Sequence, residues 1–315
     1  MTDGVLITGA GSGFGLAAAL DLAQRGFEVY ASVPDLAQRE AVEAAAAARG
    51  VTLRVLRLDV TDRASIEAAV SAMVAERRTI DGVVHSAGLG LRGFFEDLAE
   101  SEIRHVFDVN VFGVMAVTRA VLPHMRSARR GRVVIITSAG GRIASMTLSG
   151  YCAGKFALEG FGESLALEVA PLGIAVSLIE PGLVMTPHFT LHRGRARAAT
   201  DPAGFYYPWF VQHEQMVDEI LRAGRVTPQD VARAVRRALT DRRPRLRYMV
   251  GRRVKLAVLL RRYLPGELFE RLYSRQLARR ITRPATPARG LSELSLDAVT
   301  GAAPGRAVEG ARRDG

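Results

Sequence analysis

The sequence predicts an α/β protein built on a doubly wound parallel sheet, with helices on both faces and a C-terminal helical extension. From residue 4 to about residue 179, short runs that are apolar throughout alternate with longer segments of helical spacing. Strands buried on both faces carry such uninterrupted runs, and helical crossovers make neighbouring strands parallel. The chain has 315 residues, of which 48% are hydrophobic, and this is enough for one large core.

The order of the elements can be followed along the chain. Six apolar runs are the predicted strands: Val5–Ile7, Val29–Ala31, Leu53–Leu58, Val83–Val84, Val133–Ile136 and Ile174–Ile179. Segments such as Leu16–Arg25 and Ser65–Arg77 have the spacing of covering helices. After Pro181 the alternation stops, and residues 183–227 are predicted to form an irregular or partly helical insertion. Thr227 before Pro228 is typical of a helix start, which predicts a helix through Leu239 and then a short strand at Tyr248–Val250.

The C-terminal part is predicted to differ from this body. Residues 251–282 hold two amphipathic patterns, Val254–Tyr263 and Leu268–Ala278. Residues 283–315 are rich in Pro, Ala, Gly and Arg and lose periodicity, so we expect a disordered tail there. The predicted organisation is one domain over residues 1–250, with 183–227 as its lid, followed by the helical extension and the tail.

Positive charge is concentrated near the C-terminus. Residues 225–283 contain 18 Arg and Lys against 4 Asp and Glu, whereas the rest of the chain contains 25 basic and 28 acidic residues. Such a region either attracts nucleic acid or anionic lipid, or is a solvated arginine-rich surface. We favour the solvated surface and expect no nucleic-acid partner.

The compartment is suggested by three features. The first residues do not resemble a signal peptide, and no run of eighteen apolar residues predicts a membrane-spanning helix. The single cysteine, Cys152, suits a reducing compartment. We therefore expect a cytoplasmic protein, and we predict no metal site.

A glycine-rich turn follows the first predicted strand and opens a helix. It reads Thr-Gly-Ala-Gly-Ser-Gly-Phe-Gly from Thr8 to Gly15. Glycines at such a place let a diphosphate approach the backbone N–H groups of a helix N-terminus. A tight turn without a ligand is the alternative, but the strand-turn-helix context favours a nucleotide site of the Rossmann type.

A proton-transfer site is predicted around Lys155. Of 43 basic side chains, only Lys155 and Lys255 are lysine, so a lysine here indicates that an ammonium is needed. Tyr151 lies four residues earlier, on the same helix face. An ordinary tyrosine pKa is about 10, and a nearby positive charge lowers it. Ser138 follows the strand Val133–Ile136, at the strand end where such sheets bind ligands, and its hydroxyl can hydrogen-bond a reacting oxygen.

The glycine loop and the Tyr-x-x-x-Lys pattern resemble the short-chain dehydrogenase/reductase family over about residues 4–250. The resemblance implies an NAD(P)-dependent oxidoreductase in which Tyr151 is the acid/base and Lys155 lowers its pKa and anchors the ribose. It also implies that Ser138 orients the carbonyl and that Asn110 helps to hold a water of the proton relay. The implied cofactor contacts are Gly9, Ser12, Gly13, Phe14, Gly15, Val33, Asp59, Val60, Ala87, Gly88, Tyr151, Lys155, Pro181, Gly182, Val184 and Thr186.

Several positions depart from the family's usual residues. Val33 stands where an acidic residue would bind the adenosine 2′-hydroxyl, so NADP is favoured over NAD, although no arginine follows it directly. His85 and Ser86 stand where two asparagines are usual, and we interpret His85 as a structural substitute and not a catalytic base. Asp59 has the alternative of an ordinary helix N-cap region. Cys152 is interpreted as a small packed residue.

The substrate class is suggested by the segment after Tyr151. Residues 151–160, with 163–166 and 177–180, are similar to the 17β-hydroxysteroid and retinol dehydrogenase branch. The resemblance implies a hydrophobic alcohol or ketone of steroid, retinoid or long-chain type, and a homodimer or homotetramer. The aromatic cluster from Phe205 to Phe210 either walls the substrate pocket or packs the lid onto the core.

Alternatives stay open for the basic C-terminal helices and for the function. Residues 252–280 either contact an anionic membrane, making the protein peripheral to it, or pack over the site or in a dimer. We favour packing. The alternative functions are a non-catalytic NAD(P)-binding regulator or scaffold, and a membrane- or nucleic-acid-surface protein acting through the basic region.

Overall fold

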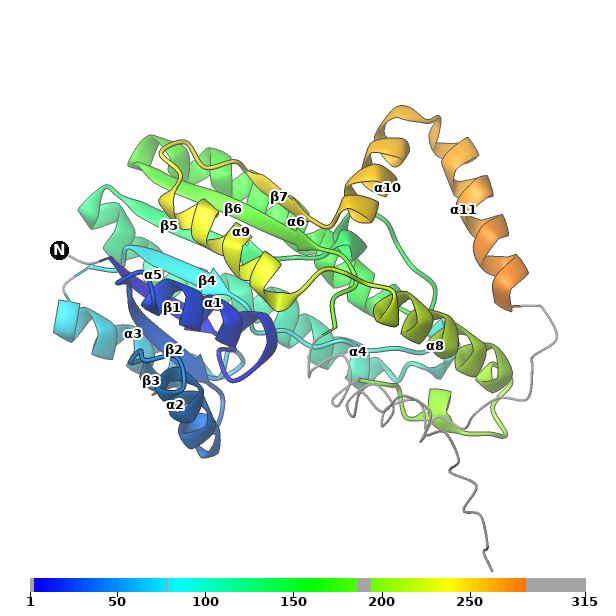
Figure 1. Ribbon diagram of the computed structural model, residues 1–315, viewed down its shortest axis with the longest axis horizontal. Helices are drawn as coiled ribbons and strands as arrows, with labels where there is room; N and C mark the ends of the chain where they lie inside the picture. Colours follow the sequence, from blue (N-terminus) through cyan, green and yellow to red (C-terminus); the bar gives the residue numbers. More distant parts are fainter. Residues whose placement is uncertain (1–2, 78, 186–193, 282–315) are drawn as a thin grey trace, which may run out of the picture.

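Residues 3–77, 79–185 and 194–281 are described by a computed structural model (Figure 1). The predicted tail, 283–315, and Thr186 lie outside the described residues. The strands form one parallel sheet in the order β3-β2-β1-β4-β5-β6-β7. Their bounds are β1 Gly4–Thr8, β2 Glu28–Val33, β3 Arg54–Arg57, β4 Gly82–His85, β5 Gly131–Ile136, β6 Ile174–Pro181 and β7 Arg247–Val250. The predicted fold class is confirmed, and each predicted apolar run overlaps a strand.

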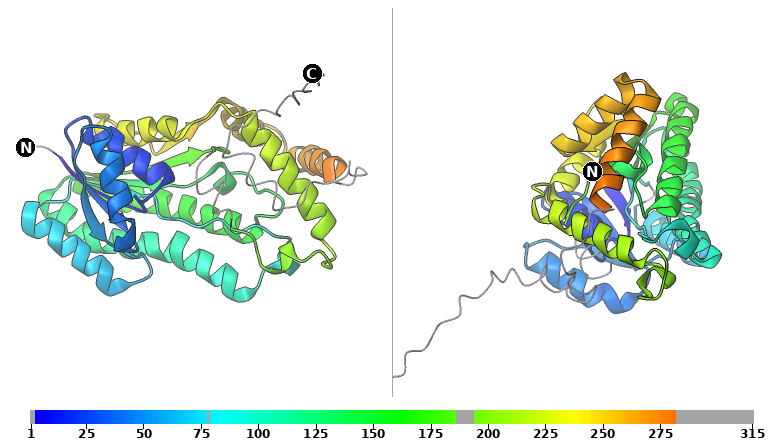
Figure 2. Two further views of the ribbon diagram at one scale, coloured as in Figure 1. Left: turned by 60° about the horizontal axis from the view of Figure 1, so that its bottom comes forward. Right: turned by 90° about the vertical axis from the view of Figure 1, so that its right-hand side faces the viewer.

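Helices cover both faces of the sheet (Figure 2). On one face lie α1 (Gly13–Ala23), α2 (Arg39–Ala47) and α9 (Pro228–Thr240). On the other lie α3 (Arg63–Arg77), α5 (Gly113–Ala128) and α6 (Ser149–Val169), with α4 (Glu100–Phe107) joined to α5 by a π-helical turn, Asp108–Phe112. Successive residues of β1 point to opposite faces, so Val5 and Ile7 enter the first core and Leu6 the second. Burial on both faces explains the uninterrupted apolar runs.

The part after β6 is more helical than predicted. Within the predicted lid, a 16-residue helix, α8, spans Tyr207–Arg222. The predicted helix start after it is confirmed, because the Thr227 N–H donates to the Asp230 carboxylate (2.8 Å) and α9 begins at Pro228. The strand β7 ends at Val250, and the predicted domain boundary at residue 250 stays a prediction. Beyond it, α10 (Arg252–Tyr263) and α11 (Gly266–Ile281) form a hairpin that projects from the sheet (Figure 1).

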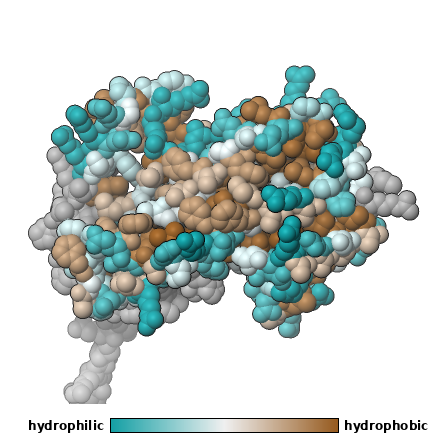
Figure 3. Space-filling model, turned by 180° about the vertical axis from the view of Figure 1, so that it is seen from behind, coloured by the Kyte–Doolittle hydropathy of each residue, from teal (hydrophilic) through white to brown (hydrophobic). Residues whose placement is uncertain are grey.

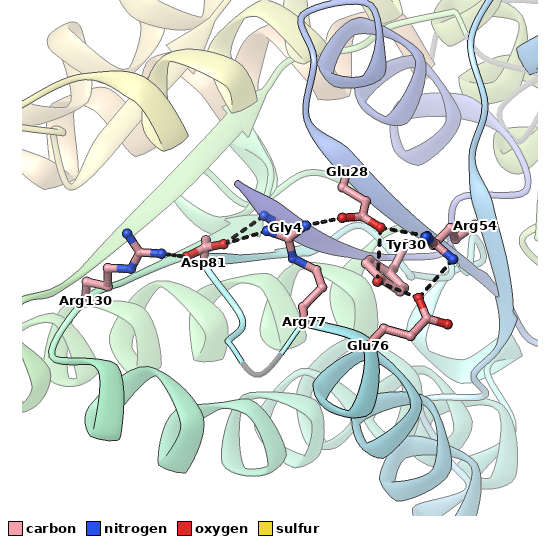
Figure 4. Close-up of polar contacts among 8 residues, drawn as sticks. All are labelled: Gly4, Glu28, Tyr30, Arg54, Glu76, Arg77, Asp81 and Arg130. Carbon is pink, nitrogen blue, oxygen red and sulfur yellow. Dashed lines mark hydrogen bonds and ion pairs between the residues drawn. The ribbon is translucent and has the colours of Figure 1, made fainter. Parts of the chain in front are cut away.

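Charged groups join the strands at the amino-terminal edge of the sheet (Figure 4). Asp81 accepts a hydrogen bond from the backbone N–H of Gly4 (2.8 Å) and pairs with Arg130. Glu28 accepts from Arg54 (2.7 Å). The remaining members of this network, which we call the amino-edge network, are Tyr30, Glu76 and Arg77. Their contacts connect β1, β2 and β3 with the C-terminal end of α3 and the start of β4.

One helical stretch of the described residues, Glu100–Ala128, is long and apolar enough by composition to cross a membrane. It comprises α4, the π-helical turn and α5, and 44% of its apolar window is buried inside the protein. Because α5 supplies Val114, Val117, Val121 and Met125 to the second core, we interpret the stretch as a core helix.

Candidate active site

The predicted site residues gather at the carboxyl edge of the sheet, opposite the amino-edge network. The glycine loop follows β1, the segment 85–88 follows β4, Ser138 follows β5 and the Pro181–Gly182 turn ends β6. These four strands are neighbours in the sheet, so their ends meet. In an open parallel sheet, this edge is where ligands bind.

The glycine loop is held by backbone geometry that side chains would disturb. Gly9 and Gly13 have φ of 66° and 57°, in the left-handed region that favours glycine. A Cβ on Gly9 would lie 2.6 Å from the Cα of Ala87, so the loop lies directly on the segment after β4. Thr8 fixes the same contact, because its Oγ1 accepts from the N–H groups of Ser86 and Ala87 (3.2 Å each).

The start of α1 fits the diphosphate of a dinucleotide. Ser12 is the N-cap, but its side chain makes no capping hydrogen bond, and the first turn of α1 carries no acidic residue. Backbone N–H groups and the positive end of the helix dipole therefore face the loop without a competing carboxylate. The loop and the helix start thus suit a dianionic ligand group, and Gly9, Ser12, Gly13, Phe14 and Gly15 would line it.

Ser138, Tyr151 and Lys155 are brought together as predicted. Tyr151 and Lys155 lie one turn apart near the start of α6, and the Lys155 Nζ is 5.7 Å from the centre of the Tyr151 ring. Ser138 hydrogen-bonds with the Tyr151 hydroxyl. Lys155, only 5% exposed, donates to the carbonyl of Ile136 (3.0 Å), the last residue of β5. The catalytic candidates therefore lie together where β5 ends and α6 begins.

The pKa values at these groups differ from the expectation. Burial raises the pKa of Tyr151, and the hydrogen bond with Ser138 and the positive charge of Arg92 offset this in part. Burial lowers the pKa of Lys155 to about 8, opposed by the negative charge of Glu159. The predicted lowering of the Tyr151 pKa by Lys155 is thus not a property of these protein groups alone, because desolvation outweighs the charges around the phenol.

Asn110 lies in the π-helical turn between α4 and α5 and is fully buried. Its side-chain amide is bonded at both ends to Leu89: the Oδ1 accepts from the Leu89 N–H (2.7 Å) and the Nδ2 donates to the Leu89 carbonyl (2.8 Å). A Cβ on Gly88 would lie 3.3 Å from that Oδ1 and 4.0 Å from the Lys155 Nζ. Asn110 therefore fixes the segment after β4 beside Lys155, and its part in a proton relay stays a prediction.

His85 and Cys152 have the surroundings of packed residues. The His85 side chain is 1% exposed, and its Nε2 shares a hydrogen bond with Thr118 (2.9 Å). Burial lowers the pKa of His85 to about 3, so the imidazole is neutral. Cys152 is 3% exposed, and burial raises the pKa of its thiol. Both observations support the structural interpretations made from the sequence.

The ends of β2 and β3 lie where the sequence predicts contacts with the adenosine of the cofactor. Val33 is completely buried in the core, so it brings no polar atom to this place. Gln38 reaches over the loop instead: a Cβ on Gly11 would lie 2.2 Å from the Gln38 Oε1. Asp59 accepts from the N–H and hydroxyl of Thr61 (2.9 and 2.7 Å), as a residue of a turn does. Gln38 is a candidate site residue that the sequence reasoning missed, because it comes five residues after the strand end.

The turn after β6 lies beside the first residues of α10. A Cβ on Gly182 would lie 2.3 Å from the Cγ2 of Val254. Val184 is 2% exposed, and Val60, at the other side of the site, packs against Gly113. Thr186 lies outside the described residues, so its predicted contact stays a prediction.

A buried ion pair attaches the lid to the site, and the sequence reasoning missed it. The Arg92 guanidinium donates to the Glu214 carboxylate on α8 (2.6 Å), and the two side chains are 3% and 0% exposed. Arg195 also donates to Glu214 (3.1 Å). Along the backbone, the Arg92 N–H bonds to the Gly194 carbonyl and the Ala196 N–H bonds to the Arg92 carbonyl (2.9 and 2.8 Å). Arg92 therefore links the lid with the surroundings of Tyr151.

A second lid contact involves Thr147, which has an unusual φ of 61° for a residue with a β-branched side chain. Its Oγ1 hydrogen-bonds with the Nδ1 of His213 (3.1 Å), next to Glu214 on α8. Its carbonyl accepts from the Gly93 N–H (3.0 Å). The loop before α6, the segment after β4 and α8 are thereby joined around the candidate site.

Comparison with known proteins shows which family the chain resembles. The short chain dehydrogenase family matches residues 3–195. The 17-beta-hydroxysteroid dehydrogenase type 1 of Homo sapiens is 38% identical over 257 residues, covering 79% of this chain and 77% of the relative. Retinol dehydrogenase 8 of Homo sapiens is 37% identical over 258 residues, covering 77% and 79%.

A solved structure extends the likeness to three dimensions. The 3-ketoacyl-(acyl-carrier-protein) reductase from Brucella melitensis, complexed with NADH, has a TM-score of 0.67 and 26% identity, covering 80% of this chain and 98% of that one. The relatives include the steroid and retinol dehydrogenases that the segment after Tyr151 resembles. The chain belongs to the short-chain dehydrogenase family of oxidoreductases.

Proposed function

We propose that the protein interconverts a hydrophobic alcohol, primary or secondary, and its aldehyde or ketone, with NADP or NAD as cofactor and Tyr151 as the acid/base. The observation that carries the proposal is the meeting of Ser138, Tyr151 and Lys155 at the carboxyl edge, beside a glycine loop that suits a diphosphate. A protein that only bound the nucleotide would not need a phenol, a hydroxyl and an ammonium at this place.

The protein groups divide the proton chemistry among them. The Tyr151 hydroxyl gives its proton to the substrate oxygen in reduction and takes it back in oxidation. The Ser138 hydroxyl hydrogen-bonds the same oxygen and so orients the reacting carbon. The Lys155 ammonium, held by the Ile136 carbonyl, would bind the ribose hydroxyls of the cofactor and place a positive charge near the phenol. Asn110 keeps the segment after β4 in place beside Lys155.

The cofactor would complete the electrostatics of the site. When bound, the nicotinamide supplies or accepts the hydride, and in its oxidised form it carries a positive charge. Since burial raises the Tyr151 pKa in the protein alone, a further positive charge beside the phenol is needed for proton transfer near neutral pH. Arg92 supplies part of it, but burial outweighs this contribution and keeps the Tyr151 pKa above its usual value.

We further propose NADP as the preferred cofactor. Val33 is buried and places no carboxylate at the end of β2, where such a group would repel a 2′-phosphate. Asp35, two residues later, caps the short helix that follows, since its Oδ1 accepts from the Ala37 N–H (2.9 Å). The proposal is tested by the ratio of kcat/KM with NADP⁺ and with NAD⁺, and a ratio favouring NAD⁺ contradicts it.

The contacts of the aromatic residues in the lid distinguish between two interpretations, a wall of the substrate pocket and packing of the lid onto the core. Phe210 is completely buried and packs the lid onto the core. Tyr206 stacks on Phe94 (4.6 Å between ring centres) and hydrogen-bonds to Glu96, while Phe205 is 80% exposed. These contacts favour the interpretation that the cluster fastens the lid. The proposed substrate class therefore depends on the similarity to the steroid and retinol dehydrogenases.

We propose that the protein is a dimer or tetramer. Figure 3 shows a band of apolar residues across the face that lies behind the sheet in Figure 1. Among the exposed apolar side chains, Phe112, in the π-helical turn before α5, is 57% exposed and Leu167, on α6, is 77% exposed. Exposed apolar area of this kind is commonly covered by another subunit. Sedimentation equilibrium gives the mass, and a strict monomer contradicts the proposal.

The function is tested by a substrate screen. Hydroxysteroids, retinol and medium- to long-chain alcohols are offered with NAD⁺ or NADP⁺, and the absorbance of the reduced nicotinamide is followed. We expect turnover of a subset, lost by at least about tenfold in Ser138→Ala. Cofactor binding without turnover of any of these compounds would instead support the regulator or scaffold alternative.

A further inference from the structure

The C-terminal hairpin has an apolar surface that the rest of the described chain does not cover. Helix α10 carries two apolar stripes on opposite sides. The inner stripe, Val254, Ala257 and Val258, is half-buried or buried and packs toward the body of the protein. The outer stripe consists of Leu256, Leu259, Leu260 and Tyr263, which are 60, 45, 45 and 74% exposed. Their spacing of i, i+3, i+4 and i+7 places them on one helix face.

Basic residues flank the outer stripe on both sides. At 100° per residue, Arg253 lies at one border of the stripe and Lys255 and Arg262 at the other, and all three are exposed. Between residues 252 and 275 the hairpin has seven basic and two acidic residues. An exposed apolar face bordered by Lys and Arg is the arrangement of helices that lie in the headgroup region of a membrane.

Helix α11 continues the same arrangement. Leu268 and Leu272, one turn apart, are 45 and 54% exposed, and Arg271 and Arg275 are exposed beside them. Phe269, by contrast, is 8% exposed and stacks on Tyr273 (5.8 Å between ring centres). The hairpin thus has an inner side that packs and an outer side that meets solvent.

The inner side touches the surroundings of the candidate active site at three places. Val254 packs against Gly182, at the turn after β6. The Arg261 guanidinium lies over the ring of Phe156, the residue after Lys155, at 6.0 Å. Burial raises the pKa of Tyr273, and its hydroxyl hydrogen-bonds with Ser145, on the loop that leads to Tyr151. The hairpin is therefore a fixed part of the site's surroundings, with its outer stripe directed away from them.

We propose that the outer face of the α10–α11 hairpin docks on the surface of an anionic lipid bilayer. An exposed apolar face can bind either a second copy of the chain or a lipid bilayer, and the net positive charge of the hairpin favours the bilayer. A second copy of this chain, related by a two-fold axis, would bring seven basic residues of one hairpin against seven of another, which is repulsive. An anionic bilayer accepts the leucines among its acyl chains and pairs the arginines with its phosphates.

Docking at this face brings the candidate active site to the bilayer surface. Apolar alcohols and ketones partition into that bilayer, so they would reach the site without crossing water. This consequence rests on the proposed function. The docking itself does not depend on the proposed function, because it is inferred from the exposure and the charge of the hairpin.

The test is co-sedimentation of the full chain with vesicles of phosphatidylcholine, with or without phosphatidylglycerol, at low and at high salt. We expect binding to the phosphatidylglycerol vesicles, weaker binding to phosphatidylcholine alone, and release at high salt. Leu256→Ser with Leu260→Ser should reduce the partition coefficient at least tenfold, by about 0.8 kcal/mol per lost CH₂ group. Arg253→Gln, Lys255→Gln and Arg262→Gln should reduce it by about fivefold per residue.

Matched control variants test whether vesicle binding depends on the hairpin or on exposed apolar and basic side chains in general. Leu36→Ser with Phe95→Ser removes two exposed apolar side chains elsewhere, and Arg63→Gln, Arg104→Gln and Arg119→Gln remove three exposed arginines elsewhere. Both control variants should bind vesicles as the parent does, and circular dichroism should show all variants folded. The proposal is overturned if the hairpin variants bind the vesicles as the parent does, or if the control variants lose as much binding as the hairpin variants. It is also overturned if Leu256→Ser with Leu260→Ser dissociates a dimer and leaves lipid binding unchanged. If the substrate screen shows no turnover, the proposed function is contradicted, whereas the vesicle-binding result is unaffected.

Discussion

The two edges of the sheet use polar side chains in opposite ways. At the amino edge, charged groups meet partners of opposite sign: Asp81 pairs with Arg130, and Glu28 with Arg54. At the carboxyl edge, the hydrogen bonds of the catalytic candidates go to neutral groups, since Lys155 donates to a backbone carbonyl and Tyr151 bonds with Ser138. Both edges are parts of one fold, so the difference reflects what each edge does.

The two edges also differ in how their side chains hold a proton, as the pKa values of Glu28 and Lys155 show. Burial acts to raise the pKa of Glu28, but its hydrogen bonds and charge pairs with Arg77 and Arg54 outweigh this and hold the pKa below its usual value. That carboxylate keeps its charge at any physiological pH. Lys155 has no such pairing, and burial brings its pKa to about 8. Charge pairing fixes protonation at the structural edge, whereas desolvation leaves the carboxyl edge able to change it.

Two tyrosines make the comparison directly testable. Burial raises the pKa of both Tyr30 and Tyr151. The Tyr30 hydroxyl, however, donates to the Glu76 carboxylate (2.9 Å), and this negative partner further favours the protonated phenol. Tyr151 has a neutral partner and lies close to positive charges. Only Tyr151 is therefore placed to give up and regain a proton.

The largest effect is expected for Tyr151→Phe, with Tyr30→Phe as the matched control. Loss of the acid/base should lower kcat by about 10³-fold or more, while cofactor binding, followed by fluorescence, persists. Tyr30→Phe should leave kcat unchanged and lower the free energy of unfolding by about 1 kcal/mol, through loss of one hydrogen bond. If Tyr151→Phe and Tyr30→Phe had equal activity, the proposed difference between the two edges would be wrong.

A smaller loss is expected for Lys155→Arg. The planar guanidinium cannot reproduce the compact ammonium that donates to Ile136, so kcat should fall by about 10²-fold. The pH profile is the sharper readout. In the reduction direction, the parent's kcat/KM should fall as pH rises through about 8, because Lys155 loses its proton there. The variant keeps its charge, so this part of the decline should disappear, and an unchanged profile would speak against a titrating Lys155.

Sequence reasoning succeeded where the chemistry is local. The glycine loop, the pair Tyr151 and Lys155, and Ser138 are each recognised within a few residues, and the parallel sheet places them together without further information. The helix start at Thr227 is also local. These features need only backbone geometry and the repeat of a helix or strand.

The features that sequence reasoning missed depend on contacts between distant segments. Arg92 and Glu214 are 122 positions apart, and the available signal was a glutamate on the apolar side of the helix 207–222, between Phe210 and Val217. The direction of the Tyr151 pKa was also missed, since it is set by burial that no motif records. For α10, two apolar stripes of similar strength left open which one packs, and only the tertiary structure shows that Leu256 is outside.

The amino edge gives a prediction about stability. Asp81→Asn should lower the free energy of unfolding by about 2 kcal/mol, because the neutral amide leaves Arg130 without its partner and weakens the bond from Gly4. Glu67→Gln, which breaks the exposed pair with Arg63, should cost under about 0.5 kcal/mol. Urea unfolding measures both, and kcat of each variant should equal that of the parent. A loss of activity without a loss of stability in Asp81→Asn would show that the two edges are not independent.

The last expected effect concerns acid stability at His85 and grows only as the pH falls. Burial lowers its pKa to about 3, so the native protein keeps a neutral imidazole, whereas the unfolded chain takes up a proton near pH 6.5. As pH falls from about 6.5 towards 3, the unfolded state gains a proton that the native state does not bind, so stability falls by up to about 1.4 kcal/mol per pH unit. His85→Gln removes this titration and should reduce the slope of stability against pH by about 1 kcal/mol per unit. Urea unfolding between pH 7 and pH 5 measures the slope. An identical slope in both proteins would mean that the imidazole is charged or accessible in the native state, and His85 would then have to be reconsidered as a proton-transfer group at the carboxyl edge.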